Sequence, residues 1–133
     1  MKELRLLMLG FGNAGRAFAR LLVEKQQEIT DYYGYDIKVV AIVTGSRGSL
    51  LNPDGLDLSG AIKEIEEFGH FNMARGDYSR ITSIEAAASV DYDVLMELTP
   101  LDIFSGQPAI DHIKTALDKG RHVITANKGP LAW

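Results

Sequence analysis

The sequence has no cysteine among its 133 residues, so disulfides, thiolate metal sites and cysteine nucleophiles are excluded. It also has no long apolar run. The apolar run near the start, residues 6–9, is too short to cross a bilayer. The charged Lys2 and Arg5 lie where a signal peptide would have its apolar segment. We therefore expect a cytoplasmic protein that has no membrane partner.

Basic residues are in the minority. The chain has 14 Lys and Arg against 18 Asp and Glu, a formal net charge of -4 and a pI near 5.3. Nucleic acids and anionic membranes require an excess of basic residues on one face, so neither is an expected partner. A small anionic ligand stays compatible with this charge, because a local site can oppose the sign of the whole protein. The length fits one domain.

Apolar runs and segments of helical period alternate along the sequence. The runs are almost continuously apolar, which is typical of strands covered on both faces. They predict strands at 3–9, 37–43, 93–98 and 122–125. Helices are predicted from Asn13 onward and over 61–68, 83–88 and 108–119. This order predicts an α/β domain with a doubly wound parallel sheet and helices on both faces.

The sequence also predicts the form of one loop and the inward face of the last helix. Residues 46–60 contain three glycines, a proline and an asparagine, which predicts an extended loop with a small hairpin near 52–55. In the last helix, Ile110, Ile113 and Leu117 recur at helical spacing, so we expect them to face the core.

The sequence predicts no metal site. His70, His112 and His122 lack the spacing and the acidic neighbours of a zinc site, so we interpret them as surface or helix-end residues. The three glutamates within 64–67 are interpreted as a solvated helix face.

A glycine-rich turn lies between the first predicted strand and the first predicted helix, and it matches G-x-G-x-x-G. The first glycine allows a sharp turn, the second lets the backbone approach a pyrophosphate, and the third lets helix and strand pack closely. Free amides at the start of the helix would face the anion. The residues expected to bind a dinucleotide here are Gly10, Phe11, Gly12, Asn13, Ala14 and Gly15.

The end of the second strand indicates which dinucleotide is bound. An acidic residue there would accept hydrogen bonds from the ribose 2′-hydroxyl of NAD, but residues 43–47 contain none. Thr44, Ser46 and Arg47 occupy this corner instead. Hydroxyl and guanidinium groups suit a 2′-phosphate, so NADP is the expected cofactor and NAD the alternative.

Two further loops follow the carboxyl ends of strands, where open parallel sheets bind ligands. Thr99 and Pro100 end one strand, and Asn127 and Lys128 follow the last. We expect them to converge near the nicotinamide and a small-molecule substrate. Lys128 could orient a substrate carboxylate or carbonyl, and could join a proton relay if burial lowers its pKa.

Several of these motifs resemble homoserine dehydrogenases. The run TANKGPLA over 125–132 closely resembles a segment of that family, and 97–100 resembles its strand-end motif. Gly106, Pro108 and the residues His112, Ile113, Lys114, Ala116 and Leu117 fit as well. The resemblance covers essentially the whole chain. Its carboxyl-terminal motif is specific, whereas the glycine turn is shared by many dehydrogenases.

The resemblance implies a Rossmann-type NAD(P)-binding domain, spanning 1–133, of a longer two-domain enzyme. Such enzymes interconvert L-homoserine and L-aspartate 4-semialdehyde by hydride transfer, on the route to threonine and methionine. The resemblance makes Lys128 a residue that assists catalysis or substrate binding. A substrate domain beyond Trp133 would supply a second lysine, an acidic residue and a homodimer interface, so the fragment alone is expected to be inactive.

Two other functions are compatible with the sequence. One is the cofactor domain of another NAD(P)-dependent semialdehyde or imine reductase, which assays of the full-length parent on those substrates would distinguish. The other is a free-standing nucleotide-sensing module without catalysis. A long coding segment beyond Trp133 would argue against the sensor.

Overall fold

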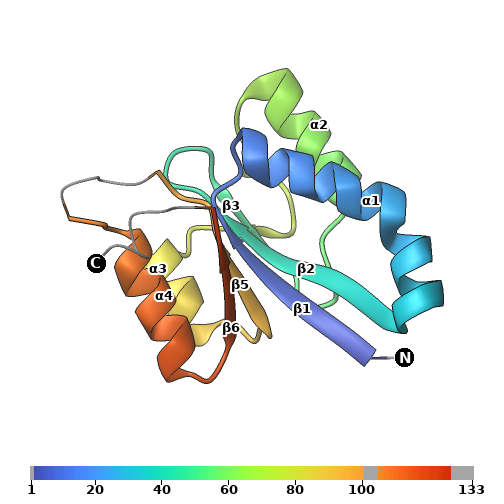
Figure 1. The fold of residues 1–133 in the computed structure, drawn as a ribbon. Coiled ribbons are helices and arrows are strands. Elements are labelled where there is room, and N and C mark those ends of the chain that lie inside the picture. Colours follow the sequence, from blue (N-terminus) through green and yellow to red (C-terminus); the bar gives the residue numbers. More distant parts are fainter. Residues whose placement is uncertain (1, 101–104, 127–133) are drawn as a thin grey trace.

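The computed structural model describes residues 2–100 and 105–126, which form a six-stranded sheet covered by helices on both faces (Figure 1). The strands are β1 (Lys2–Leu9), β2 (Tyr35–Val43), β3 (Ser49–Leu51), β4 (Tyr78–Ser79), β5 (Val94–Glu97) and β6 (His122–Thr125). The helices are α1 (Asn13–Tyr33), α2 (Leu58–Phe68), α3 (Ser83–Ser89) and α4 (Ala109–Asp118). The α1–α2 pair packs on one face of the sheet and the α3–α4 pair on the other.

The strand order is β4-β3-β2-β1-β5-β6. β1 runs parallel to β2 and to β5, and β5 runs parallel to β6, so the predicted doubly wound sheet is confirmed. β3 and β4 add a short antiparallel edge. The four predicted strands all form, with ends within two residues of those expected. Because the parallel strands point the same way, their carboxyl ends meet at one edge, where ligands bind in such sheets.

The loop predicted at 46–60 is more regular than its composition suggested. After a tight turn, Ser49 pairs with Val43 and β3 runs back along β2. α2 then begins at Leu58, where the Asp57 carboxylate accepts the amide hydrogen of Gly60 at 3.2 Å and so caps the helix. A turn does form near 52–55, with the Gly55 amide donating to the Asn52 carbonyl, but it joins β3 to α2 and closes no hairpin.

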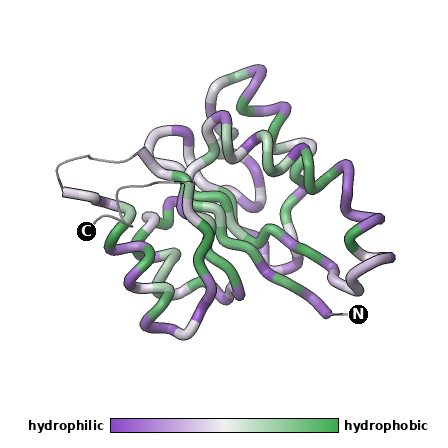
Figure 2. Tube along the Cα trace, in the orientation of Figure 1, coloured by the Kyte–Doolittle hydropathy of each residue, from purple (hydrophilic) through white to green (hydrophobic). Residues whose placement is uncertain are grey.

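The core has two layers, one on each side of the sheet. The middle of the sheet is hydrophobic, whereas hydrophilic and hydrophobic residues alternate along the helices (Figure 2). Beneath α1 and α2 the buried residues include Leu6, Met8 and Phe11. Beneath α3 and α4 they include Leu7, Leu95 and Tyr92. Alternate residues of β1 therefore contribute to opposite layers, as expected for a strand covered on both faces.

The inward face of α4 differs from the prediction. Its buried residues are Ala109, His112 and Ala116, whereas Leu117 is 58% exposed, so its predicted inward position was wrong. The interpretation of His112 as a surface or helix-end residue was also wrong, since its side chain is buried. Small residues face the sheet because they let the helix approach it closely. The buried imidazole has polar partners, which are described below.

Candidate functional site

The glycine turn joins the carboxyl ends of three strands. The Gly10 amide donates to the Val43 carbonyl of β2 at 2.8 Å, and the Leu98 amide donates to the Leu9 carbonyl of β1 at 2.8 Å. Gly10 has φ +103°, and a Cβ there would lie 2.6 Å from the Leu98 carbonyl oxygen. Only glycine fits this conformation and this contact. The sharp turn that the motif predicted is therefore present at Gly10.

Gly12 is the residue before the first turn of α1, and no side chain caps this helix. A Cβ on Gly12 would meet nothing within 4 Å, so the space beside this backbone is open. The first amides of a helix lack intrahelical partners and carry the positive end of the helix dipole. This arrangement suits an anionic group such as a pyrophosphate.

Arg16 supports the glycine turn from within α1. Its guanidinium donates to the Phe11 carbonyl at 2.7 Å and to Oδ1 of Asn13 at 3.0 Å. Burial and the nearby guanidinium of Arg47 lower the pKa of Arg16. The two arginines therefore lie close enough to make this corner electropositive. No role was predicted for Arg16, although its place directly after the third glycine could have signalled one.

The corner after β2 is organised by Thr44. Its hydroxyl donates to the Gly48 carbonyl at 2.6 Å and accepts the Arg47 amide hydrogen at 2.9 Å. These bonds hold the turn that carries Ser46 and Arg47. Within the described part of the chain, the Arg47 guanidinium forms no hydrogen bond or ion pair, so it is available to a ligand.

A cleft of about 980 Å³ lies at this edge of the sheet. Its walls are the glycine turn, the corner after β2, the segment 78–83 and the end of β5. Arg47 and Arg80 line it, and none of the lining residues within 2–100 and 105–126 is acidic. The cleft is therefore locally positive in a protein of net charge -4. Its volume is in the range of about 300–1,000 Å³ that is typical of small-molecule sites.

The cleft contains most of the residues predicted to bind a ligand. Its lining includes Gly10, Phe11, Gly12, Thr44, Ser46, Arg47, Thr99 and Pro100. The side chain of Phe11 is in the core against Phe71, so it is the backbone of Phe11 that faces the cleft. The predicted Asn13, Ala14 and Gly15 belong to the first turn of α1 and are not part of the lining. Asn127 and Lys128 lie outside the described residues.

The wall formed by residues 78–83 was not predicted from the sequence. The ring of Tyr78 packs against Gly48, where a Cβ would lie 2.6 Å from the ring. Gly48 has φ +85°, so glycine is needed there for conformation as well as for space. The antiparallel strands β3 and β4 bring this wall to the cleft. No local motif marks such a contact between residues 30 positions apart.

Glu97, at the end of β5, is fully buried just behind the cleft. Its Oε1 accepts the Thr99 amide hydrogen at 2.9 Å and also the Thr99 hydroxyl. Its Oε2 lies 2.6 Å from Nδ1 of His112 on α4. The other imidazole nitrogen, Nε2, lies 2.8 Å from Oγ of Ser83. The end of β5 is therefore held to both helices on this face.

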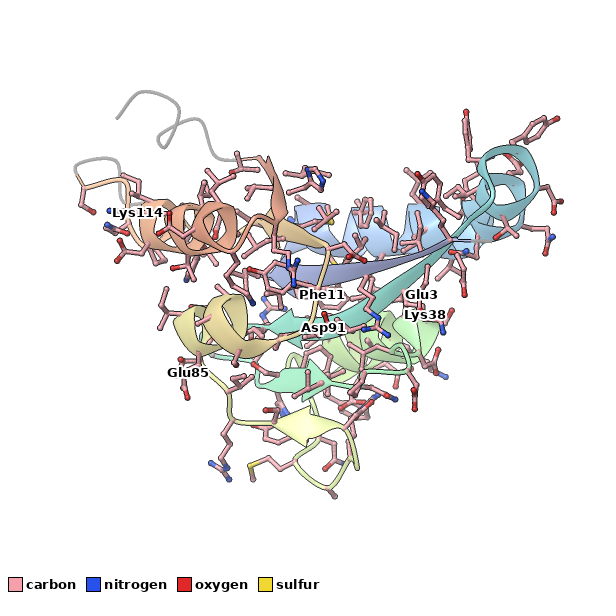
Figure 3. All side chains as sticks on the ribbon, turned by 90° about the horizontal axis from the view of Figure 1, so that it is seen from below. Glu3, Phe11, Lys38, Glu85, Asp91 and Lys114 are labelled. Atoms are coloured by element: carbon pink, nitrogen blue, oxygen red, sulfur yellow. The ribbon has the colours of Figure 1, made fainter. Side chains whose placement is uncertain are left out.

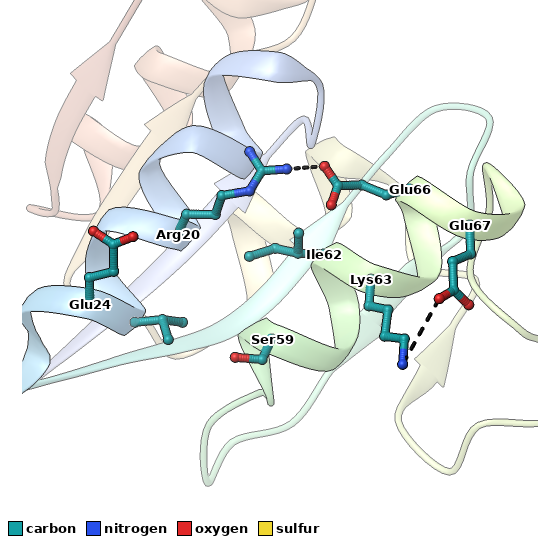
Figure 4. A pocket seen from close by; sticks show the side chains of 8 residues that line it. Arg20, Glu24, Ser59, Ile62, Lys63, Glu66 and Glu67 are labelled. Atoms are coloured by element: carbon teal, nitrogen blue, oxygen red, sulfur yellow. Dashed lines mark hydrogen bonds and ion pairs between the residues drawn. The ribbon is translucent and has the colours of Figure 1, made fainter.

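A separate groove between α1 and α2 has paired charges (Figure 4). Arg20 on α1 pairs with Glu66 on α2, and Lys63 pairs with Glu67 at 3.9 Å. The two cations of this groove, Arg20 and Lys63, are thus already paired with carboxylates. The remaining glutamate of this helix, Glu64, is largely buried and bonded to Arg75, so the interpretation of all three as a solvated face was wrong for Glu64.

At the opposite end of the sheet, charges are also paired. Lys38 on β2 lies 3.2 Å from Glu3 on β1, and the two side chains sit side by side in Figure 3. Arg5 pairs with Asp91. The contrast with Arg47 indicates that ligand-binding charge is concentrated at the carboxyl ends of the strands.

Two negative observations apply to the described residues. No group of three or more His, Asp or Glu side chains there is placed to hold a metal ion. None of the helices in residues 2–100 and 105–126 is long and apolar enough to cross a membrane.

Comparison with known proteins identifies a family. The model of the homoserine dehydrogenase NAD-binding domain matches residues 10–132. A homoserine dehydrogenase of Methanocaldococcus jannaschii is 39% identical over 127 residues, which is 96% of this chain and 37% of that protein. An NAD(+)-dependent homoserine dehydrogenase of Pseudomonas canavaninivorans is 32% identical, covering 99% of this chain and 38% of that protein.

Solved structures agree with this result. A hyperthermophilic archaeal homoserine dehydrogenase in complex with NADPH superposes with a TM-score of 0.78 at 26% identity, over 98% of this chain and 37% of that one. The homoserine dehydrogenase of Thermoplasma acidophilum superposes with a TM-score of 0.79 at 27% identity, over the same shares. The chain thus spans a little over a third of the length of these relatives.

Proposed function

The chain belongs to the family of homoserine dehydrogenase NAD-binding domains, and we propose that it binds NADP(H), with NAD(H) as the weaker ligand, in the cleft at the carboxyl ends of its parallel strands. The pyrophosphate would rest against the backbone at Gly12 and the first amides of α1. The 2′-phosphate would be held by Ser46 and Arg47. When bound, the nicotinamide supplies or accepts the hydride.

One observation carries this assignment. Among the described residues that line the cleft with the glycine turn, Arg47 and Arg80 are charged and none is acidic, although the protein as a whole is acidic. A ribose 2′-hydroxyl would call for a carboxylate at the end of β2, whereas a 2′-phosphate calls for cations and hydroxyls. The residues present therefore favour the phosphorylated dinucleotide. The NADPH complex of a structural relative supports the same choice.

For the whole enzyme, we propose the interconversion of L-homoserine and L-aspartate 4-semialdehyde in the cytoplasm. This chain would be its single amino-terminal domain, spanning 1–133. Thr99 and Pro100 would lie beside the nicotinamide, with Asn127 and with Lys128 as the residue that assists substrate binding or catalysis. A second domain would complete the substrate site, because this chain covers only 37–38% of these relatives. We propose that the same domain forms a homodimer.

Titration of the chain with NADPH and NADH, followed by the emission of the reduced nicotinamide, tests the binding proposal. We expect saturable binding of both, with NADPH the tighter. Absence of NADPH binding at millimolar concentration would refute it. Assay of the full-length parent for NADP-dependent oxidation of L-homoserine tests the activity separately, with other semialdehyde and imine substrates as the comparison.

A further inference from the structure

A chain of hydrogen bonds runs behind the cleft and links three elements. It passes from Thr99 through the Glu97 carboxylate of β5 to the imidazole of His112 on α4, and from there to Ser83 on α3. Glu97 and His112 are both essentially buried, at 0% and 1% exposure. Every polar atom of these two side chains has a partner in this chain of bonds. The arrangement is therefore a complete polar network within an apolar layer.

Such a network is not what stability alone would select. Burial of ionisable groups costs several kcal/mol per ion, and apolar residues of similar volume are often as stable or more stable. The other inward residues of α4 are Ala109 and Ala116, which shows that an apolar face suffices for packing there. We therefore explain the polar pair by the residues that it holds at the two ends of the network.

Both ends of the network reach the cleft. Thr99 and Ser83 line it, whereas Glu97 and His112 lie behind its wall. Nδ1 of His112 is held by the carboxylate, which fixes the ring and so fixes the position of Nε2 beside Ser83. The same carboxylate holds the Thr99 amide. The pair thus determines where two cleft residues stand.

Ser83 keeps hydrogen-bonding capacity for a ligand. A hydroxyl has one donor and two acceptor sites, and the bond to Nε2 uses only one of them. If Nε2 accepts, the serine oxygen can still accept from a ligand; if Nε2 donates, the serine hydrogen can be donated to it. A ribose hydroxyl can both donate and accept, so it fits Ser83 in either case.

From these contacts we infer that Ser83 hydrogen-bonds a ribose hydroxyl of the bound dinucleotide, and that Glu97 and His112 are positioning residues that act through Ser83 and Thr99. The inference rests on the proposed function, because it requires the dinucleotide to occupy this cleft. It adds to the site a wall that the glycine motif does not include.

Titration with NADPH of three single variants, one double variant and a control tests the inference. Ser83→Ala should bind roughly three- to tenfold more weakly, the effect of one lost hydrogen bond. Ser83→Thr keeps the hydroxyl and should recover most of that loss. His112→Asn keeps a donor for Glu97 but loses the bond to Ser83, and should weaken binding similarly. Ser89→Ala, on the exposed end of the same helix, is the matched control.

The double variant Ser83→Ala with His112→Asn distinguishes positioning from a general structural effect. If His112 acts through Ser83, the double variant binds no more weakly than either single variant. Multiplied losses, or wild-type affinity in Ser83→Ala, would overturn the inference while leaving NADPH binding intact. Failure of the wild-type chain to bind NADPH would instead refute the proposed function, and this inference with it. Ser83 is only partly buried, so its variants give an answer even if His112→Asn does not fold.

Discussion

Gly10 stands so close to Leu98 that a Cβ on the glycine would lie 2.6 Å from the leucine carbonyl oxygen. The contact joins the end of β1 to the residue that follows β5, and both segments line the cleft. Because the neighbour is backbone, it cannot move aside as a flexible side chain could. The shape of the cleft therefore depends on glycine at this position.

Gly10→Ala should lower the free energy of unfolding by about 2 kcal/mol or more, because it combines a positive φ with a backbone clash. Gly34→Ala is the matched control, since Gly34 also has a positive φ but open space around it. Urea unfolding measures both. Equal losses in the two variants would show that the contact with Leu98 contributes nothing.

Arg47→Ala should weaken NADPH binding by roughly tenfold, which corresponds to about 1.4 kcal/mol, and should change NADH binding much less. The reason is that only NADPH carries the 2′-phosphate. Arg5→Ala removes the same charge at the opposite end of the sheet and controls for net charge. Parallel losses of NADPH and NADH affinity in Arg47→Ala would mean that the guanidinium does not recognise the phosphate.

Arg75 connects the loop after α2 to the helix itself. Its Nη1 lies 2.6 Å from Glu64, and its Nε lies 2.8 Å from Asp77. The hydrogen bond from Arg75 lowers the pKa of Asp77 below its usual value of 3.8, against a smaller effect of burial. The same loop carries Phe71, which packs on Phe11 of the glycine turn. This cluster therefore supports the cleft from behind.

Arg75→Met should destabilise the protein by about 1–3 kcal/mol at pH 7, since it leaves two partly buried carboxylates without their partner. The folded-state pKa of Asp77 is depressed, so its stabilising effect is fully present above its unfolded pKa and is lost as pH falls through the folded value. The difference between wild type and variant should accordingly shrink below about pH 4.

Urea unfolding at pH 7 and at pH 3 measures this difference. Lys25→Met, which removes an exposed pair with Glu28, should change stability by less than about 1 kcal/mol at either pH. A constant gap between wild type and Arg75→Met across this range would contradict the assignment to Asp77.

The order of strands and helices was predictable from the sequence, but the helix faces were not. For α4 the sequence pattern pointed to Ile110, Ile113 and Leu117, whereas Ala109, His112 and Ala116 are buried. A prediction from hydrophobic periodicity assigns large apolar residues to the core. Close packing of a helix on a sheet instead requires small ones, and this depends on the distance between elements, which the local sequence does not encode.

Part of the cleft was predictable, because some of its residues directly follow a predicted strand and others do not. Thr44, Ser46 and Arg47 follow directly after a strand, so the rule for parallel sheets locates them. Tyr78 and Ser83 reach the cleft only because β3 runs back along β2 and β4 pairs with β3, and no motif marks these pairings. The buried partner of Glu97 was missed because His112 lies 15 residues away, beyond the reach of any spacing argument.

A dinucleotide diphosphate should contact the open backbone at Gly12, and the variant Gly12→Ala is the sharpest test of this contact. A Cβ there meets no protein atom within 4 Å, so the melting temperature should stay close to that of wild type. The methyl group would stand between the backbone and the diphosphate, so NADPH affinity should fall by roughly tenfold or more, at least about 1.4 kcal/mol. Unchanged NADPH affinity in this folded variant would show that the diphosphate does not rest against Gly12.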